Sequence, residues 1–187
     1  LPGPAGGVTF VQFEATVDLA DRLPLGTLRV AARLRHWVCE NAKTTRAFLK
    51  RVDAVCPLAQ PLQALAIVEL PRPPKGRIVA SPLDLAPLLA AALAGDDVGL
   101  VCEAGLPALA DPGAPLVAAA HAARLRVVAL PGASSIALAV AASGLNGQSF
   151  AFVGYLPVEA GERSERIREL ESVSRRLAQT QVAIETP

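Results

Sequence analysis

Short hydrophobic runs alternate with longer segments whose apolar residues recur at helical spacing, and this pattern predicts alternating strands and helices. We expect strands over residues 8–13, 37–40, 62–70, 98–102, 126–130, 150–153 and 181–185. We expect helices over residues 25–34, 42–52, 85–94, 115–123, 134–143 and 162–178. Such alternation is typical of a mainly parallel sheet covered by helices, so the predicted fold class is α/β.

Polar residues mark the ends of two predicted helices. Asn41 precedes the helix at 42–52, where its side-chain oxygen can accept from the free N–H groups of the first turn. Ser134 or Ser135 can cap the helix at 134–143 in the same way, and Gly144 ends it. The N–H groups at such a start can also bind a carboxylate or ribose oxygen, but a capped helix is the ordinary interpretation.

The chain is expected to divide into two small αβα domains. We place an N-terminal α/β domain at residues 1–113 and a C-terminal α/β domain at residues 114–187. The proline-rich segment 71–76 is interpreted as a connector. The second unit has only three expected strands and two expected helices, which is little for independent stability, so we expect this domain to be incomplete. The chain contains no Met, so we expect that its true start or some other residues are missing.

Composition indicates a compact fold, because 52% of the residues are apolar and 19% are charged. The net charge of +1 produces no global attraction to nucleic acid or to an anionic membrane. One segment differs, because a single acidic residue, Glu40, stands among Arg22, Arg29, Arg33, Arg35, Lys43, Arg46, Lys50 and Arg51. A solvated helix face is the ordinary interpretation, and a surface for an anionic partner is the alternative.

The cysteines and the apolar stretches indicate the cellular compartment in which we expect the protein. Cys39, Cys56 and Cys102 share no metal-ligand spacing, so no metal site is expected. Cys39 and Cys102 fall in strand-like runs and are expected to be buried thiols, which favours a reducing cytoplasm. The uncharged stretch at 127–158, about thirty residues, is long enough to cross a bilayer, but proline, glycine and serine residues interrupt it. With no signal peptide visible either, we expect a cytoplasmic protein without a membrane span.

The most informative segment runs from the predicted strand at 98–102 into an acidic loop bounded by glycine and proline. This loop reads C-E-A-G-L-P-A-L-A-D-P-G from Cys102 to Gly113, and Gly105 lets the main chain approach a ligand without a Cβ atom in the way. A similar loop, L-P-G-A-S-S, follows the predicted strand at 126–130. Each loop alone is an ordinary turn or helix start, but two in tandem predict one cleft.

Several common sites are disfavoured. No G-x-G-x-x-G follows the first predicted strand and no G-x-x-x-x-G-K-[ST] occurs, so the usual dinucleotide and nucleoside triphosphate sites are not expected. Ser134 and Ser135 lie outside a G-x-S-x-G motif, and nothing marks His36 or His121 as a partner base. A serine nucleophile is therefore not expected.

Taken in order, these motifs resemble the tetrapyrrole methylase superfamily of S-adenosylmethionine-dependent methyltransferases. The chain is most similar to its ribosomal RNA small subunit methyltransferase I branch, whose S-D-A-G-T-P-x-x-S-D-P-G corresponds to residues 102–113. The branch's A-E-D-T-R-x-T-x-x-L-L resembles C-E-N-A-K-T-T-R-A-F-L at 39–49, and its G-F-L-P resembles G-Y-L-P at 154–157. The P-G-V-S-S form and the later E-S-P resemble residues 131–135 and 185–187.

The chain departs from the branch on the side that resembles the substrate site. The P-T-P-I-G-N-L motif after the first strand is absent, and Asn41 and Lys43 stand where the branch has Asp and Arg.

The resemblance implies a homodimeric methyltransferase with S-adenosylmethionine held between two domains and a cytidine 2'-hydroxyl of ribosomal RNA as the acceptor. The cofactor-binding residues that it implies are Glu103, Ala104, Gly105, Leu106, Pro107, Asp111, Leu130, Pro131, Gly132, Ser134, Ser135, Leu156 and Pro157. Glu40, Lys43 and Glu103 are the candidates for positioning or deprotonating the acceptor hydroxyl, with no order among them.

Two alternatives stay open. One is a corrin or porphyrin C-methyltransferase of the same fold, which a deep apolar cleft would favour over a basic, open one. The other is a non-catalytic binding protein that retains the fold, which the missing first-loop motif would favour.

Overall fold

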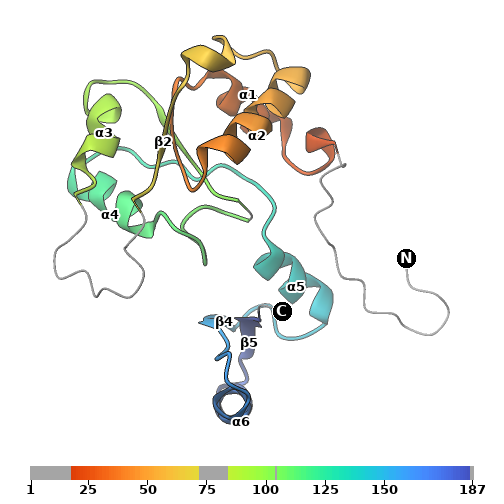
Figure 1. Ribbon diagram of the computed structural model, residues 1–187. Helices are drawn as coiled ribbons and strands as arrows, with labels where there is room; N and C mark the ends of the chain where they lie inside the picture. Colours follow the sequence, from red (N-terminus) through yellow and green to blue (C-terminus); the bar gives the residue numbers. More distant parts are fainter. Residues whose placement is uncertain (1–17, 72–83, 104, 186–187) are drawn as a thin grey trace.

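The computed structural model describes residues 18–71, 84–103 and 105–185 (Figure 1). The strand expected at 8–13 lies outside the described residues, as do most of the expected connector at 71–76 and the expected cofactor residue Ala104.

Three short strands form the first sheet: β1 (His36–Cys39), β2 (Ala66–Glu69) and β3 (Val98–Val101). Their order is β2-β1-β3 and both pairings are parallel, with Cys39 opposite Glu69 on one side and opposite Val101 on the other. All three strands therefore end at one edge of the sheet, and the predicted α/β class with parallel sheets is confirmed.

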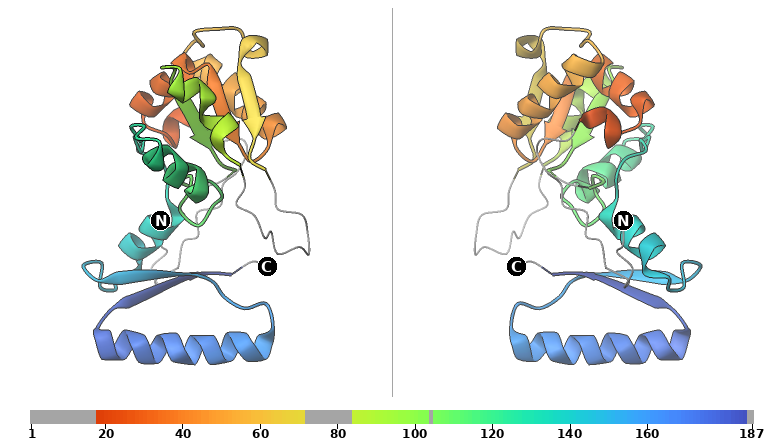
Figure 2. Two further views of the ribbon diagram at one scale, coloured as in Figure 1. Left: turned by 90° about the vertical axis from the view of Figure 1, so that its left-hand side faces the viewer. Right: turned by 90° about the vertical axis from the view of Figure 1, so that its right-hand side faces the viewer.

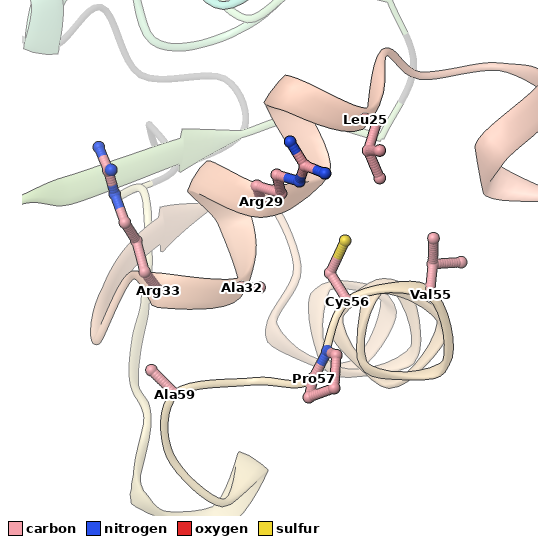
Figure 3. Close-up of a pocket in the computed structure, with 8 residues that line it drawn as sticks. All are labelled: Leu25, Arg29, Ala32, Arg33, Val55, Cys56, Pro57 and Ala59. Carbon is pink, nitrogen blue, oxygen red and sulfur yellow. The ribbon is translucent and has the colours of Figure 1, made fainter.

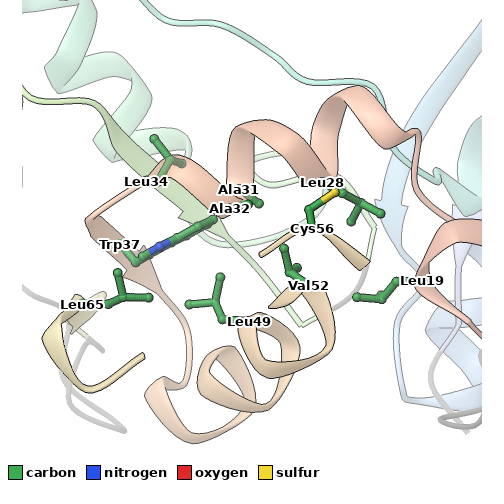
Figure 4. Close-up of a cluster of buried hydrophobic side chains, with 10 residues drawn as sticks. All are labelled: Leu19, Leu28, Ala31, Ala32, Leu34, Trp37, Leu49, Val52, Cys56 and Leu65. Carbon is green, nitrogen blue, oxygen red and sulfur yellow. The ribbon is translucent and has the colours of Figure 1, made fainter. Parts of the chain in front are cut away.

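Helices cover both faces of this sheet. Trp37 packs with residues of α1 (Leu25–Arg33) and α2 (Ala42–Val55) in one hydrophobic cluster, which Figure 4 shows in close-up. Val38, the next residue of β1, packs with α3 (Ala86–Leu93) and α4 (Ala114–Ala122) in a second cluster. Successive residues of a strand point to opposite faces, so β1 lies at the centre of an αβα sandwich.

The remaining elements form a second unit. It contains α5 (Ser135–Ser143), β4 (Phe150–Tyr155), α6 (Ala160–Leu177) and β5 (Thr180–Ile184), with β4 and β5 paired in parallel. Figure 2 shows α6 along one face of the β4–β5 sheet and α5 between that sheet and the first unit. Leu170 is the buried residue of α6, so this unit has a thin core.

Helix caps follow the sequence expectation. The Asn41 side chain accepts from the backbone N–H of Lys43 at 2.9 Å and of Thr44 at 3.3 Å at the start of α2. Ser134 accepts from the Ala137 N–H at 3.3 Å at the start of α5, and Gly144 ends α5 in the left-handed conformation. The predicted caps are confirmed.

One expected strand is wrong and another begins later than expected. The segment 126–130 pairs with neither described sheet, and Val127 and Val128 are exposed, because an apolar run forms a strand only where a neighbour offers its N–H and C=O groups. Residues 62–64 form a 3-10 turn, η2 (Leu62–Ala64), after Pro61, so β2 begins at Ala66 instead of 62.

The cysteines differ in burial. Cys39 is fully buried, as expected, but Cys102 lies past the end of β3 and is half-buried, so its expected full burial is wrong. All three cysteines are free thiols.

Leu116 and Ala120 of α4 pack with Val38, so this helix belongs to the core of the first unit. The boundary between residues 113 and 114 stays a prediction. Among the described helices, none is both long and apolar enough to span a bilayer.

Candidate functional site

Acidic residues gather where the three parallel strands end. Glu40 directly follows β1, Glu69 is the last residue of β2, and Glu103 lies two residues past the end of β3. In open parallel sheets, ligands bind outside the carboxyl ends of the strands. The position of these carboxylates therefore makes this edge the candidate site.

Hydrogen bonds connect two of these carboxylates. The Thr44 hydroxyl donates to Glu103 Oε1 at 2.6 Å, and the Glu103 backbone N–H donates to Glu40 Oε2 at 3.3 Å. The structure thus brings together two of the three predicted catalytic residues, Glu40 and Glu103, and adds Thr44.

The third carboxylate has a structural partner. Glu69 accepts a hydrogen bond from the backbone N–H of Ala42 at 2.7 Å, at the first residue of α2. This bond satisfies an N–H group that the helix itself leaves unpaired. Glu69 therefore helps to fix the start of α2 next to Glu40.

The predicted catalytic Lys43 lies in the first turn of α2. Its backbone is held by the Asn41 cap, and its side chain is exposed. No ion pair joins its ammonium to another residue in the described part of the chain. Lys43 thus shares a turn with Thr44 and is positioned through its backbone alone.

The first loop folds back on itself. The Cys102 thiol lies 3.4 Å from Asp111 Oδ2 and 3.8 Å from the Gly105 carbonyl oxygen, so the start, middle and end of the loop meet. Gly105 has a φ of +76°, a conformation that a side chain would strain. Within this geometry Asp111 contacts the loop itself, where it braces the turn around Gly105.

The second loop lies against the first. A Cβ atom built on Gly132 would be 3.5 Å from Leu106 Cδ2 and 3.6 Å from Leu23 Cδ2, so the backbone of the second loop approaches both side chains. The Thr27 hydroxyl of α1 donates to the Pro131 carbonyl oxygen at 2.6 Å. The two predicted cofactor loops are therefore neighbours, and α1 anchors the second one.

Of the remaining predicted cofactor residues, Leu130, Pro107 and Ser135 adjoin the two loops, whereas Leu156 and Pro157 lie in the second unit. Leu130 precedes Pro131 in the second loop, Pro107 follows Leu106 in the first, and Ser135 is the first residue of α5. Leu156 donates its N–H to Ile184 O at 2.9 Å, and Pro157 O accepts from Arg163 at 3.4 Å. These two contacts tie Leu156 and Pro157 to the second unit.

Comparison with known proteins decides the family. The sequence profile of the tetrapyrrole (corrin/porphyrin) methylases matches residues 23–187, nearly the whole chain. The chain belongs to this family. The resemblance seen in the motifs is confirmed.

Individual relatives of this tetrapyrrole methylase match over part of their length. "Ribosomal RNA small subunit methyltransferase I" of Mesorhizobium japonicum is 43% identical over 86 residues, which cover 46% of this chain and 29% of the relative. The protein of the same name from Vibrio cholerae is 41% identical over 83 residues, covering 44% and 29%. That from Streptococcus pyogenes is 34% identical over 140 residues, covering 73% and 44%. The chain thus matches less than half the length of these relatives.

Two cavities in the described part of the methylase lie away from the two loops. One, of about 450 Å³, lies between α1 and the end of α2 (Figure 3), and one of about 80 Å³ lies between the first sheet and α3. Neither is lined by a predicted site residue. The candidate site therefore rests on the strand ends and the loop contacts.

Sequence reasoning missed Thr44 and Glu69. Glu69 could have been found, because it ends a predicted strand next to a proline-rich segment. Thr44 carries no sequence signal of its own, since its role depends on how the start of α2 faces β3.

Proposed function

We propose that the protein is an S-adenosylmethionine-dependent methyltransferase that acts on a ribose hydroxyl of small-subunit ribosomal RNA. The observation that carries the proposal is the hydrogen-bonded network of Glu40, Glu103 and Thr44 at the strand ends. Glu103 belongs to the first loop, whose Leu106 lies next to Gly132 of the second loop. The names of the relatives support ribosomal RNA as the acceptor.

The residues present fit the cofactor. Gly105 and Gly132 expose backbone in two neighbouring loops, and α5 begins directly after the second loop with N–H groups that can donate to a ligand oxygen. Glu103, Gly105, Leu106 and Pro107 would hold the cofactor from the first loop, and Leu130, Pro131, Gly132, Ser134 and Ser135 from the second. When bound, S-adenosylmethionine supplies a methyl group on a sulfonium that is already primed for displacement.

The chain's own residues would orient the acceptor and remove its proton. Glu40 or Glu103 would accept that proton, and the 2.6 Å hydrogen bond from the Thr44 hydroxyl holds one oxygen of Glu103 in place. Fixing a base within hydrogen-bond reach of a hydroxyl is the main requirement of this step. Thr44 is thus a positioning residue, because it acts through Glu103.

We also propose that the protein works as a homodimer in the cytoplasm. Phe150, Tyr155, Leu138 and Leu145 of the second unit are exposed apolar or aromatic side chains, which a partner copy would cover. The three free thiols fit a reducing compartment.

The test is transfer of labelled methyl groups from S-adenosylmethionine to small-subunit ribosomal RNA. We expect the parent protein to label the RNA, and Glu103→Gln to lower kcat roughly 100-fold or more, since a positioned base contributes about that factor. Thr44→Val should lower kcat roughly tenfold, because the hydrogen bond that holds the charged Glu103 carboxylate is removed.

Thr44→Ser is the matched control, because it keeps the hydroxyl and should keep kcat near the parent value. Parent protein that binds RNA and cofactor yet transfers no methyl group, or a fully active Glu103→Gln, would contradict the proposed mechanism. Transfer to a corrinoid or porphyrin and not to RNA would favour the other acceptor class.

A further inference from the structure

The two strands of the second sheet end together, as those of the first sheet do. Tyr155, the last residue of β4, lies opposite Ile184, the last residue of β5. Figure 2 shows that α6 begins at this same edge of the sheet. In parallel α/β sheets, ligands bind outside the carboxyl ends of the strands. The segments that follow β4 and β5 therefore lie at the edge where this unit is expected to meet a ligand.

A bulge redirects β4 just before this edge. The register of β4 on β5 shifts between Phe152 and Tyr155, where β4 has one residue more than its partner. Gly154 lies in this bulge with a φ of +81°. Bulges change the direction of the residues that follow them and are common beside active sites. Leu156 and Pro157, the predicted cofactor residues of the second unit, come directly after the bulge.

Arg163 of α6 contacts the segments that follow both strands. Its Nη1 group donates to the Val158 carbonyl oxygen at 2.9 Å and to the Pro157 carbonyl oxygen at 3.4 Å. Its Nε atom lies 3.4 Å from Glu185 Oε1, past the end of β5. A guanidinium carries several donors in one rigid plane, so a single side chain can serve all three oxygens. Arg163 thus connects the segment after β4 with the residue after β5.

These contacts, and not the stability of α6, explain an arginine at this position. Arg163 lies in the first turn of α6, where a positive charge opposes the helix dipole, whereas Arg175 and Arg176 lie in the last turn, where the dipole favours them. The side chains of Arg163 and Glu185 are 32% and 58% exposed, and ion pairs so exposed add little to stability. The contacts of Arg163 therefore matter mainly for where they hold the backbone.

We propose that Arg163 is a positioning residue of the cofactor site, which holds the segment 156–158 against the end of β5 so that Leu156 and Pro157 contact S-adenosylmethionine. Leu156 is fixed by its N–H bond to Ile184 O at 2.9 Å, and Arg163 holds the next two carbonyl oxygens. The inference rests on the proposed function, because it requires the methyl donor at this edge of the sheet.

The test compares two glutamine variants of α6. Arg163→Gln removes the contacts with both strand ends, and Arg175→Gln removes an exposed ion pair with Glu171 near the opposite end of the same helix. Glutamine has nearly the helix propensity of arginine, so both variants should keep α6. Urea denaturation measures stability, and calorimetry measures the Kd of S-adenosylhomocysteine. Methyl transfer to small-subunit ribosomal RNA gives kcat and the KM of each substrate.

We expect Arg163→Gln to bind S-adenosylhomocysteine roughly tenfold more weakly, because hydrogen bonds from a charged donor no longer fix Leu156 and Pro157. The KM for S-adenosylmethionine should rise by a similar factor, while the KM for RNA and the kcat at saturating cofactor stay at the parent values. Arg175→Gln should match the parent in all of these constants. A residue that only stabilised the fold would lower the free energy of unfolding and leave the cofactor KM unchanged.

Arg163→Lys keeps the positive charge and tests the guanidinium separately. The lysine ammonium is a point charge that does not span the same three oxygens, so we expect an affinity for S-adenosylhomocysteine between those of the parent and Arg163→Gln. If Arg163→Gln does not fold, Arg163→Lys decides the question, and a parent-like cofactor affinity of this variant would then contradict the proposal.

A folded Arg163→Gln protein that binds S-adenosylhomocysteine as tightly as Arg175→Gln would overturn the assignment. Failure of the proposed function would look different, because the parent protein itself would then bind no S-adenosylhomocysteine or transfer no methyl group to RNA.

Discussion

At the scale of single residues, hydrogen bonding gives the candidate site its shape. Thr44 connects the first turn of α2 to Glu103 beyond β3, and Cys102 connects both ends of the first loop through Asp111 and Gly105. Sequence motifs pointed to Glu40, Gly105 and Asp111, because these residues match the family motifs at 39–49 and 102–113. They could not locate Thr44, whose importance depends on a hydrogen bond between residues far apart in the chain.

Gly105 allows a specific prediction, since its φ of +76° explains why glycine stands there. Gly105→Val should lower the free energy of unfolding by about 1 to 2 kcal/mol or somewhat more, through backbone strain, and abolish binding of S-adenosylhomocysteine. Stability is measured by urea denaturation and binding by calorimetry.

Gly144 provides the matched control, because it has a φ of +70° and nothing within 4 Å of a built Cβ atom, at the far end of α5. Gly144→Val should be strained to a similar extent and still bind the ligand. If Gly105→Val binds like the parent, the first loop is structural and its residues do not hold the cofactor.

At the scale of elements, the sequence predicted most helices and strands because caps and periodicity are local signals. Asn41 and Ser134 begin their helices and Gly144 ends α5, as expected. Strand pairing depends on residues far apart in the chain, and local patterns do not reveal it. The apolar run at 126–130 was therefore wrongly expected to form a strand, since no described strand pairs with it. Likewise, the sequence could not show that the Trp37 ring lies against Gly99 of the neighbouring strand.

This close approach predicts the effect of a substitution in β3. A Cβ atom on Gly99 would lie 2.7 Å from Trp37 Cε3 and 2.8 Å from Leu34 Cδ1, both in the buried cluster. Gly99→Ala should therefore lower the free energy of unfolding by about 1 to 3 kcal/mol, through overpacking.

Gly26→Ala on α1 is the control, because nothing lies within 4 Å of its built Cβ atom, and it should be neutral or stabilising by about 0.5 to 1 kcal/mol. Denaturant unfolding measures both variants. A Gly99→Ala protein as stable as the parent would show that Trp37 does not pack on this strand as described.

At the scale of the whole molecule, the first unit supplies the carboxylates and both loops, and α1 supports the second loop through Thr27. The sequence predicted that the two loops share one cleft, but it could not show that α1 anchors the second loop, because Thr27 and Pro131 are 104 residues apart in the chain.

Cofactor binding is the central claim, and titration calorimetry with S-adenosylhomocysteine tests it most directly. The account predicts measurable heat and a micromolar or lower Kd, which corresponds to a binding free energy of about −8 kcal/mol or a more negative value. Neither heat nor a thermal shift at millimolar S-adenosylhomocysteine would contradict it, since the two neighbouring loops would then hold no methyl donor.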